Sequence, residues 1–195
     1  NDPSINVEYL KRADKSVDRM IQIIDDLETI SQLEVGTLEL ELEIYDIAQQ
    51  IKDVIDALEF QASKKEIKLQ LAKKYDKEIL VKADKFRIRQ VLVNLITNSI
   101  KYGKEKGKTL ISINLFDEQV IVEIKDNGIG IAEKHLPRLF ERFYRVDKGR
   151  SREQGGTGLG LAIVKHIIEA HGETIDVTSS LNESTRIRST LKRGN

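Results

Sequence analysis

The sequence predicts an α+β fold, a two-layer α/β sandwich in which helices cover one face of a mixed β-sheet, preceded by a long helix. Segments in which apolar and polar residues alternate are interleaved with segments whose apolar residues recur every three or four positions. These are the periods of strands and helices. Glycine-rich motifs at 126–131 and 156–161 follow a predicted strand and precede a predicted helix, respectively. The first 34 residues carry an apolar helical stripe and no strand pattern.

The composition fits a folded core under a heavily charged surface. Of the 195 residues, 39% are hydrophobic and 33% are charged, which suits one domain with an appendage. The 32 basic residues balance the 32 acidic ones, so we expect no nucleic-acid partner, since such binding depends on excess positive charge. The absence of cysteine excludes disulfides and thiolate metal sites. No apolar stretch is long enough to span a bilayer, so we expect no membrane segment in this chain.

Residues from about 6 to 33 are expected to form one long helix, with a start signal at Pro3 and an end at Gly36. Its apolar residues alternate steps of three and four positions, as in a coiled coil or a helical bundle: Leu10, Ala13, Val17, Met20, Ile24 and Leu27. This stripe can pack on the helix's own domain or on another helix of a dimeric bundle. The length of the helix and the glycine after it favour the bundle.

The segment after Gly36 has the period of a strand. Its apolar residues are Leu38, Leu40, Leu42 and Ile44, and a glutamate separates each of them from the next. This alternation predicts a half-buried strand with the apolar residues inward. Asp46 is then expected to cap a helix over 47–63.

The rest of the chain predicts further strands and two more helices. The segments with strand character are 67–71, 79–81, 110–116, 119–125, 174–179 and 185–191. One helix is expected over 85–102, capped by Asp84 and ended by Gly103, and another over about 158–170.

One face of the helix over 85–102 carries polar side chains suited to a metal and phosphate ligand. They are separated by steps of four, three and one residue, which places them together: Asn94, Asn98, Lys101 and Tyr102. Amide oxygens ligate hard cations such as Mg²⁺, and lysine binds phosphate. Alone this pattern is weak, because two asparagines on a helix are more often solvated or capping.

The two glycine motifs supply the other groups that a nucleotide site needs. Asp126 ends a predicted strand before Gly128 and Gly130, where its carboxylate can accept a hydrogen bond from an exocyclic amine such as that of adenine. Otherwise it is an ordinary turn or cap residue. The segment 156–160 offers backbone N–H donors at a helix start, as phosphate sites do, or else it is a flexible loop. No P-loop is present, and Glu133 replaces the third glycine of a Rossmann pattern.

Together these motifs resemble the catalytic, ATP-binding domain of bacterial sensor histidine kinases, the enzymes of two-component systems. The resemblance covers roughly residues 5–180, and four motifs match in order and spacing. Residues 94–102 are similar to the N box of the family, and residues 126–131 to its first glycine box. Residues 139–147 are similar to its F box, and residues 156–161 to its second glycine box. The long helix resembles the second helix of the dimerisation and phosphoacceptor hairpin. The resemblance therefore implies a partial hairpin domain over 1–36 and an ATP-binding domain over 37–195.

The resemblance also implies a role in binding ATP or Mg²⁺ for each matching position. The residues that it implies for ATP binding are Asn94, Asn98, Lys101, Tyr102, Asp126, Gly128, Ile129, Gly130, Ile131, Gly156, Thr157, Gly158, Leu159 and Gly160. Among them, Asn98 is the implied Mg²⁺ ligand, and Asp126 is the residue that would bind the adenine amine.

The catalytic candidates implied by the resemblance are Asn94, Lys101 and Arg145. Arg145 would stabilise charge on the transferred phosphoryl group, or it forms an ordinary surface ion pair. Residues 132–155 would form a lid over ATP, with Phe140 and Phe143 anchoring it.

The implied reaction is transfer of the γ-phosphoryl group of ATP, with Mg²⁺, to a histidine and then to an aspartate of a response-regulator receiver domain. The intact protein would be a homodimer, and this chain the cytoplasmic portion of a membrane-anchored sensor. Two alternatives stay open: an ATPase like gyrase and the chaperones, or an interaction module that binds no nucleotide. The ATPases place a water-activating glutamate where this chain has Asn94, and an amide is a poor base. The complete glycine motifs argue against the module.

Two features depart from the family pattern. The acceptor histidine of the family lies in an acidic-Leu-Arg-x-Pro setting, which His135, His166 and His171 lack. We therefore expect all three to be structural and this chain not to phosphorylate itself. The last strand carries arginines where apolar residues are usual. Either its register is shifted by one residue, with Ile187 and Leu191 inward, or it is a poorly packed edge strand.

Overall fold

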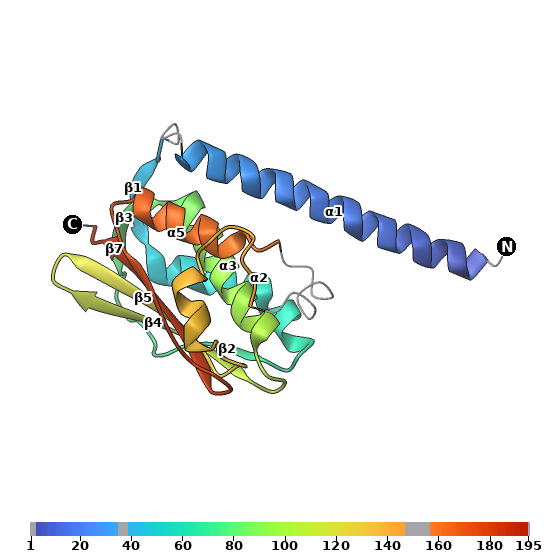
Figure 1. Ribbon diagram of the computed structural model, residues 1–195. Coiled ribbons are helices and arrows are strands. Elements are labelled where there is room, and N and C mark those ends of the chain that lie inside the picture. The colour runs from blue at the N-terminus through green and yellow to red at the C-terminus, as the bar shows by residue number, and fades with distance from the viewer. Residues whose placement is uncertain (1–2, 35–38, 147–156, 195) are drawn as a thin grey trace.

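The computed structural model describes residues 3–34, 39–146 and 157–194 of the chain. Its elements follow one another in the order expected from the sequence (Figure 1). They are α1 (Pro3–Glu34), β1 (Leu42–Asp46), α2 (Ile47–Ser63), β2 (Lys68–Leu71), β3 (Leu80–Asp84), α3 (Lys85–Tyr102), β4 (Lys108–Phe116), β5 (Gln119–Asp126), the 3₁₀ helix η1 (Glu133–Arg138), α5 (Gly160–Ala170), β6 (Ile175–Ser180) and β7 (Ser184–Lys192).

The predicted two-layer sandwich is confirmed. Five strands form a sheet in the order β2-β4-β5-β7-β6, antiparallel except for the parallel pair β2 and β4. Helices α2, α3 and α5 cover one face of this sheet (Figure 1). Alternate strand residues face the helices, so Ile111, Val122 and Ile187 are buried in the same core as Ile96 and Ile163 of the helices. Strands β1 and β3 form a second, two-stranded sheet.

The long helix α1 extends well beyond the sandwich, and only its C-terminal part lies against it (Figure 1). Ile30 is fully buried in the core, and Ile23 packs against that core. The apolar stripe noted in the sequence lies on a different face, since Leu10, Met20 and Ile24 are between 55% and 69% exposed. The helix therefore docks on its own domain through residues other than the stripe, and the pairing of the stripe with a second helix stays a prediction.

Strand β1 corrects one expectation about burial. Leu42 and Ile44 were expected to point inward, but they are 50% and 52% exposed, while Tyr45 is buried. The strand also begins at Leu42, later than the alternation suggests. β1 pairs only with β3, and this narrow ribbon turns Tyr45 rather than the aliphatic side chains toward the helices. Alternation predicts that one face is buried, but not which one.

The helix boundaries follow the capping residues closely. Asp46 accepts a hydrogen bond from the N–H of Ala48 at the start of α2, and Asp84 accepts one from the N–H of Arg87 at the start of α3. Gly103 ends α3 with a backbone of φ −63° and ψ 154°. A side chain there would meet the carbonyl oxygen of Ser99 at 2.6 Å. Close approach, not a left-handed conformation, therefore requires glycine at this helix end.

The last strand has the first of the two expected arrangements. Ile187 and Leu191 are buried, and β7 lies between β5 and β6 rather than at an edge of the sheet. The arginines face outward, where Arg188 pairs with Asp176 of β6 at 2.7 Å. The one-residue shift thus gives the arginines acidic neighbours in water and keeps the core apolar.

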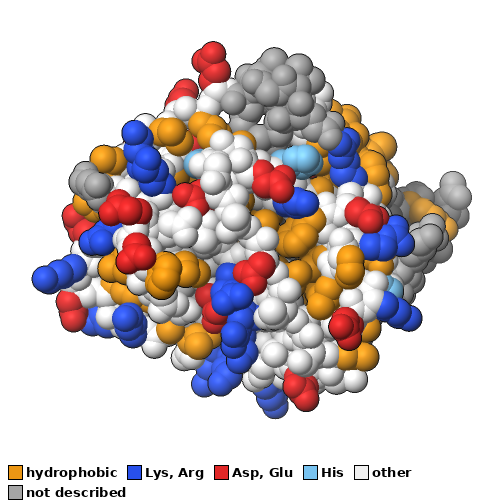
Figure 2. All heavy atoms as spheres, turned by 60° about the vertical axis from the view of Figure 1, so that its left-hand side comes forward, with side chains coloured by type: hydrophobic (Ala, Val, Ile, Leu, Met, Phe, Trp, Pro, Cys, Tyr) orange, Lys and Arg blue, Asp and Glu red, His pale blue; other side chains and the backbone are white. Residues whose placement is uncertain are grey.

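The surface bears out the balanced composition. Figure 2 shows the side of the molecule that lies at the left of Figure 1, where basic and acidic side chains are interspersed and the hydrophobic ones form small separate patches. No helix of the described residues combines the length and the apolar character that a membrane crossing would require.

A buried pair of hydroxyl groups joins the sheet to α3. Thr109 of β4 has no exposed surface and donates a hydrogen bond to Oγ of Ser99 at 2.8 Å. Ser99 in turn donates to the carbonyl oxygen of Ile96 at 2.7 Å. The two hydroxyl groups are therefore not equivalent, because Thr109 depends on Ser99 for its acceptor but Ser99 does not depend on Thr109 for its own.

This asymmetry predicts unequal costs for two conservative substitutions. Ser99→Ala leaves the Thr109 hydroxyl proton buried without an acceptor and should lower the free energy of unfolding by about 1–3 kcal/mol. Thr109→Val keeps the shape and leaves the Ser99 donation intact, so it should cost about 0.5–1.5 kcal/mol. Urea denaturation of both variants measures the difference, and an equal or reversed order would contradict this account.

Candidate functional site

The first glycine motif is held against the C-terminal end of α3. Asp126, the last residue of β5, accepts a hydrogen bond from the N–H of Gly128 at 2.8 Å. The N–H of Ile129 then donates to the carbonyl oxygen of Tyr102 at 3.1 Å. A Cβ on Gly128 would overlap that same carbonyl oxygen, so this close approach of two backbones needs glycine.

The other side of the first motif is held by the turn between β6 and β7. Gly130 has a φ of +63°, and a Cβ there would overlap the carbonyl oxygen of Ser180. The N–H of Ile131 donates to Oγ of Ser179 at 2.8 Å, and the N–H of Asn182 donates to the carbonyl oxygen of Ile129 at 2.7 Å. The motif therefore lies in a fixed path between α3 and the end of the sheet.

The polar face of α3 meets the second glycine motif at Asn94. The amide nitrogen of Asn94 donates to the carbonyl oxygen of Gln90 at 3.1 Å, which turns its amide oxygen away from that bond. A Cβ on Gly160 would lie 2.7 Å from this amide oxygen. Asn98 is half-buried one turn further along α3, and Nζ of Lys101 lies 5.3 Å from the centre of the Tyr102 ring. The predicted face thus leads from one glycine motif to the other.

Three parts of the chain converge on the second glycine motif. Gly158 has a φ of +80°, and its carbonyl oxygen accepts a hydrogen bond from the N–H of Phe143 at 2.9 Å. Thr157 donates from its hydroxyl to Oδ2 of Asp26 in α1 at 3.1 Å. With Asn94 beside Gly160, the motif touches α1, α3 and the segment that follows η1.

Burial shifts the pKa of two groups at this site. Burial raises the pKa of the Asp126 carboxyl group, although the backbone N–H groups of Gly128 and Thr185 act in the opposite direction. Burial also raises the pKa of the Tyr102 phenol, while the positive charge of Arg145 lowers it. Arg145 therefore lies close enough to Tyr102 for their charges to interact, at the end of α3 where the first motif begins.

The structure brings most of the predicted residues together. Those of α3, of the first motif and of 157–160 form one site. Gly156 and the lid residues 147–155 lie outside the described residues. Of the two expected lid anchors, Phe140 is half-buried, but the side chain of Phe143 is 57% exposed and is no anchor, whereas Leu139 is buried. Phe143 is instead held through its backbone.

Some supporting residues gave no signal in the sequence. Lys65, which follows α2, donates from Nζ to the carbonyl oxygens of Ile100 and Lys101 at 3.1 and 2.7 Å and so caps the end of α3. Asp26 and Ser179 also contact the motifs from distant parts of the chain. These contacts join residues at least 35 positions apart, and no local pattern marks such pairs.

The donors at this site suit a cation that arrives with phosphate. In the part of the chain that the structure describes, no group of three His, Cys, Asp or Glu side chains could hold a metal ion. Asn94 and Asn98 provide neutral amide oxygens. Mg²⁺ is commonly bound by one or two protein oxygens together with water and substrate phosphates, and this donor set fits that mode of binding.

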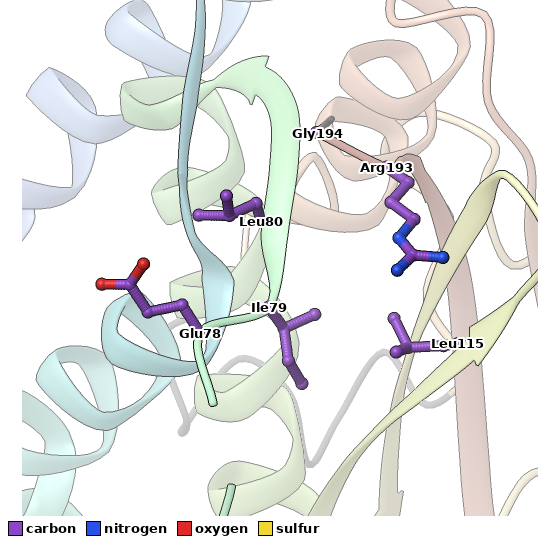
Figure 3. A pocket seen from close by; sticks show the side chains of 6 residues that line it. All are labelled: Glu78, Ile79, Leu80, Leu115, Arg193 and Gly194. Atoms are coloured by element: carbon purple, nitrogen blue, oxygen red, sulfur yellow. The ribbon is translucent and has the colours of Figure 1, made fainter. Parts of the chain in front are cut away.

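A small cavity elsewhere takes no part in this site. It has a volume of about 130 Å³ and is lined by Glu78, Ile79, Leu80, Leu115, Arg193 and Gly194. Figure 3 shows it between the start of β3 and the strand that carries Leu115, with the side chain of Glu78 pointing away. It contains none of the residues discussed above.

Comparison with known proteins agrees with this geometry. Residues 83–195 match the family described as histidine kinase-, DNA gyrase B-, and HSP90-like ATPase. The sensor histidine kinase WalK of Bacillus subtilis is 36% identical over 185 residues, which cover 94% of this chain and 30% of that protein. The chain thus spans about a third of the length of this curated relative.

Solved structures give the same result. The histidine kinase AdeS of Acinetobacter baumannii superposes with a TM-score of 0.78 at 28% identity, covering 100% of this chain and 87% of that one. Full-length ShkA, solved in complex with AMPPNP, superposes with a TM-score of 0.82 at 26% identity, covering 96% of this chain and 39% of that one.

The geometry at Gly130 predicts a large effect of a single methyl group. Gly130→Ala combines a left-handed backbone with an overlap on the Ser180 carbonyl oxygen, and it should lower the free energy of unfolding by at least about 3 kcal/mol. Gly172→Ala is the matched control, because Gly172 has a φ of +72° and nothing within 4 Å of an added Cβ. The control should lose only about 1–2 kcal/mol. Equal losses in urea denaturation would show that the close contact at Gly130 is absent.

The raised pKa of Asp126 predicts that its charge destabilises the fold. The folded protein binds this proton more tightly than the unfolded chain, whose carboxyl group has a pKa near 3.8. Stability from this group is therefore complete below pH 3.8 and is lost as the pH rises through the higher folded pKa. Asp126→Asn should be at least as stable as the unchanged chain at pH 7. Unfolding measured against pH should show this advantage shrinking as the pH falls, and a variant that is less stable at every pH would contradict the prediction.

Proposed function

The chain belongs to the family of histidine kinase-, DNA gyrase B-, and HSP90-like ATPases, and we propose that it is the ATP-binding catalytic part of a two-component sensor histidine kinase. The carrying observation is that α3 contacts both glycine motifs, Tyr102 at the first and Asn94 at the second. A carboxylate, backbone amides and neutral oxygen ligands are thereby assembled around one helix.

Asp126 would recognise the base. Its Oδ1 already accepts the N–H of Gly128, and a carboxylate has further lone pairs for the exocyclic amine of adenine. Gly128 and Gly130 would admit the base, with Ile129 and Ile131 beside it. A guanine ring presents an oxygen where adenine has its amine, so the carboxylate should favour ATP over GTP.

The phosphates would lie between α3 and the start of α5. The backbone N–H groups of 157–160 lie at and just before the first residue of α5, where a helix N-terminus favours negative charge. Asn98 would hold Mg²⁺, with Asn94 and Lys101 beside the phosphates. The bound metal would neutralise charge on the phosphates during transfer.

Phosphoryl transfer requires mainly positioning and charge neutralisation. Lys101 and Arg145 are the cations that we assign to it, since Nζ of Lys101 lies 5.3 Å from the centre of the Tyr102 ring and the charge of Arg145 acts on the same phenol. Asn94 cannot serve as a base, because its amide nitrogen donates to Gln90 and its oxygen is only weakly basic. This favours transfer to an acceptor over hydrolysis of ATP.

The reaction of the whole protein extends the same proposal. The acceptor would be a histidine on a helix that pairs with α1, and the phosphoryl group would pass to the aspartate of a response-regulator receiver domain. Residues 1–36 would then be the second helix of a hairpin that makes the intact protein a homodimer, and 37–195 would be the ATP-binding domain. The exposed stripe of α1 supports this, because nothing in the described residues covers it. We assign this chain to the cytoplasmic portion of a membrane-anchored sensor.

Calorimetric titration with a non-hydrolysable ATP analogue tests the proposal. The chain should bind the analogue more tightly with Mg²⁺ than without it. Asn98→Ala should remove most of this Mg²⁺ dependence, and Asp126→Asn should weaken binding roughly tenfold or more by loss of a charge-assisted hydrogen bond. Asp126→Asn should also narrow the preference for the ATP analogue over the GTP analogue.

Asn114→Ala is the matched control, since Asn114 is exposed on β4 away from the site, and it should bind like the unchanged chain. Failure of the folded, unchanged chain to bind any nucleotide would refute the kinase assignment and favour the interaction module. Steady release of phosphate by this chain alone would instead favour the ATPase.

A further inference from the structure

Asp26 is a buried carboxylate on the helix that precedes the sandwich. It is only 7% exposed, although it lies on α1 among residues that face water. A carboxylate removed from water is costly unless it is hydrogen-bonded. One bond that compensates is donated by the hydroxyl of Thr157 to Oδ2 at 3.1 Å. The contact therefore joins α1 directly to the second glycine motif, 131 residues away in the chain.

Thr157 transmits this contact to the backbone of the motif. Its hydroxyl oxygen accepts a hydrogen bond from the N–H of Leu159 at 3.2 Å. Leu159 is the N-cap residue of α5, and its apolar side chain cannot accept a hydrogen bond from the first turn of that helix. The hydroxyl has a single proton, and Asp26 takes it. The direction of that bond turns the oxygen lone pairs toward the Leu159 N–H.

The position of Asp26 depends on how α1 is docked. Ile23 and Ile30 are three and four residues away on the same face, and both pack on the core of the sandwich. Helix α1 contacts α5, and Figure 1 shows the two helices side by side at the C-terminal end of α1. A shift of α1 along α5 would withdraw the Asp26 carboxylate from Thr157.

From this arrangement we propose that Asp26 is a positioning residue for the phosphate end of the nucleotide site. The docked α1 orients Thr157 through Asp26, and Thr157 fixes the backbone of the motif at the start of α5. This rests on the proposed function, because it assumes that the N–H groups of 157–160 bind the phosphates of ATP. The base end of the site, at Asp126, is held by α3 and by the β6–β7 turn, and does not depend on Asp26.

Side-chain replacements at both ends of the bond test the proposal. Asp26→Ala should weaken binding of the ATP analogue about three- to tenfold, as expected for loss of a hydrogen bond to a charged group. Asp26→Asn retains an acceptor oxygen and should recover most of the affinity. Thr157→Val should weaken binding at least as much as Asp26→Ala, and Thr157→Ser, which keeps the hydroxyl, should weaken it less than Thr157→Val. The double variant of Asp26→Ala and Thr157→Val should bind no more weakly than Thr157→Val alone.

A second ligand separates positioning from general loosening of the fold. AMP lacks the β- and γ-phosphates, so its binding, measured by competition, should change less than twofold in Asp26→Ala. Asp14→Ala is the matched control, because Asp14 is an exposed acidic residue of the same helix, and it should leave both affinities unchanged. Equal weakening of AMP and of the ATP analogue, together with a lower unfolding midpoint, would overturn the proposal.

The possible failures are distinguishable. Unchanged affinity of Asp26→Ala for the ATP analogue, beside normal binding by the parent chain, would overturn the role of Asp26 and leave the proposed function in place. Absence of binding by the parent chain would overturn the proposed function and, with it, this inference.

Discussion

Helix α3 lies against both glycine motifs, through its backbone at the first motif and through the Asn94 side chain at the second. At one end the carbonyl oxygen of Tyr102 occupies the space that a Cβ on Gly128 would need, and in the middle of the helix the amide oxygen of Asn94 occupies the space beside Gly160. This contact with a single helix brings the two motifs together. It fixes the distance between the two motifs and makes one helix the common wall of a site whose parts are far apart in the sequence.

The sandwich holds α3 at the other end as well. Asp84 caps its first turn, and the N–H of Asp84 donates to Nε2 of His171 at 3.0 Å. Nδ1 of His171 lies 2.7 Å from the carbonyl oxygen of Ile167. Since Nε2 accepts, the proton of the neutral ring is on Nδ1, and the ring joins the start of α3 to the end of α5. His171 thus ties the start of one site helix to the end of the other, which agrees with a structural role for this histidine.

The parts of the structure that the sequence predicted well are those set by local chemistry. Asp46 and Asp84 mark helix starts because a carboxylate satisfies free N–H groups within three residues. The buried face of β1 was predicted wrongly, and so was Phe143 as an anchor of the lid, because both depend on which surface covers them in the fold. Periodicity also identified the apolar stripe of α1. The face that docks on the sandwich carries Ile23 and Ile30, and no periodic pattern in the sequence marks that face. Contacts such as Lys65 with the end of α3 depend on the completed fold and leave no trace in the local sequence.

Two of the five described non-glycine residues with a positive φ lie beside the glycine motifs. Phe143 has a φ of +58° and Asn182 a φ of +65°, a conformation that costs a residue with a side chain about 1–2 kcal/mol. Each of the two donates its N–H to a glycine motif, to the carbonyl oxygens of Gly158 and Ile129. Gly130 and Gly158 adopt the same region without that cost. A fold selected for stability alone would favour neither a left-handed phenylalanine nor a half-buried carboxylate at Asp126. Their position beside the two motifs fits the proposed binding site, because a site can give up stability where a ligand completes the interactions.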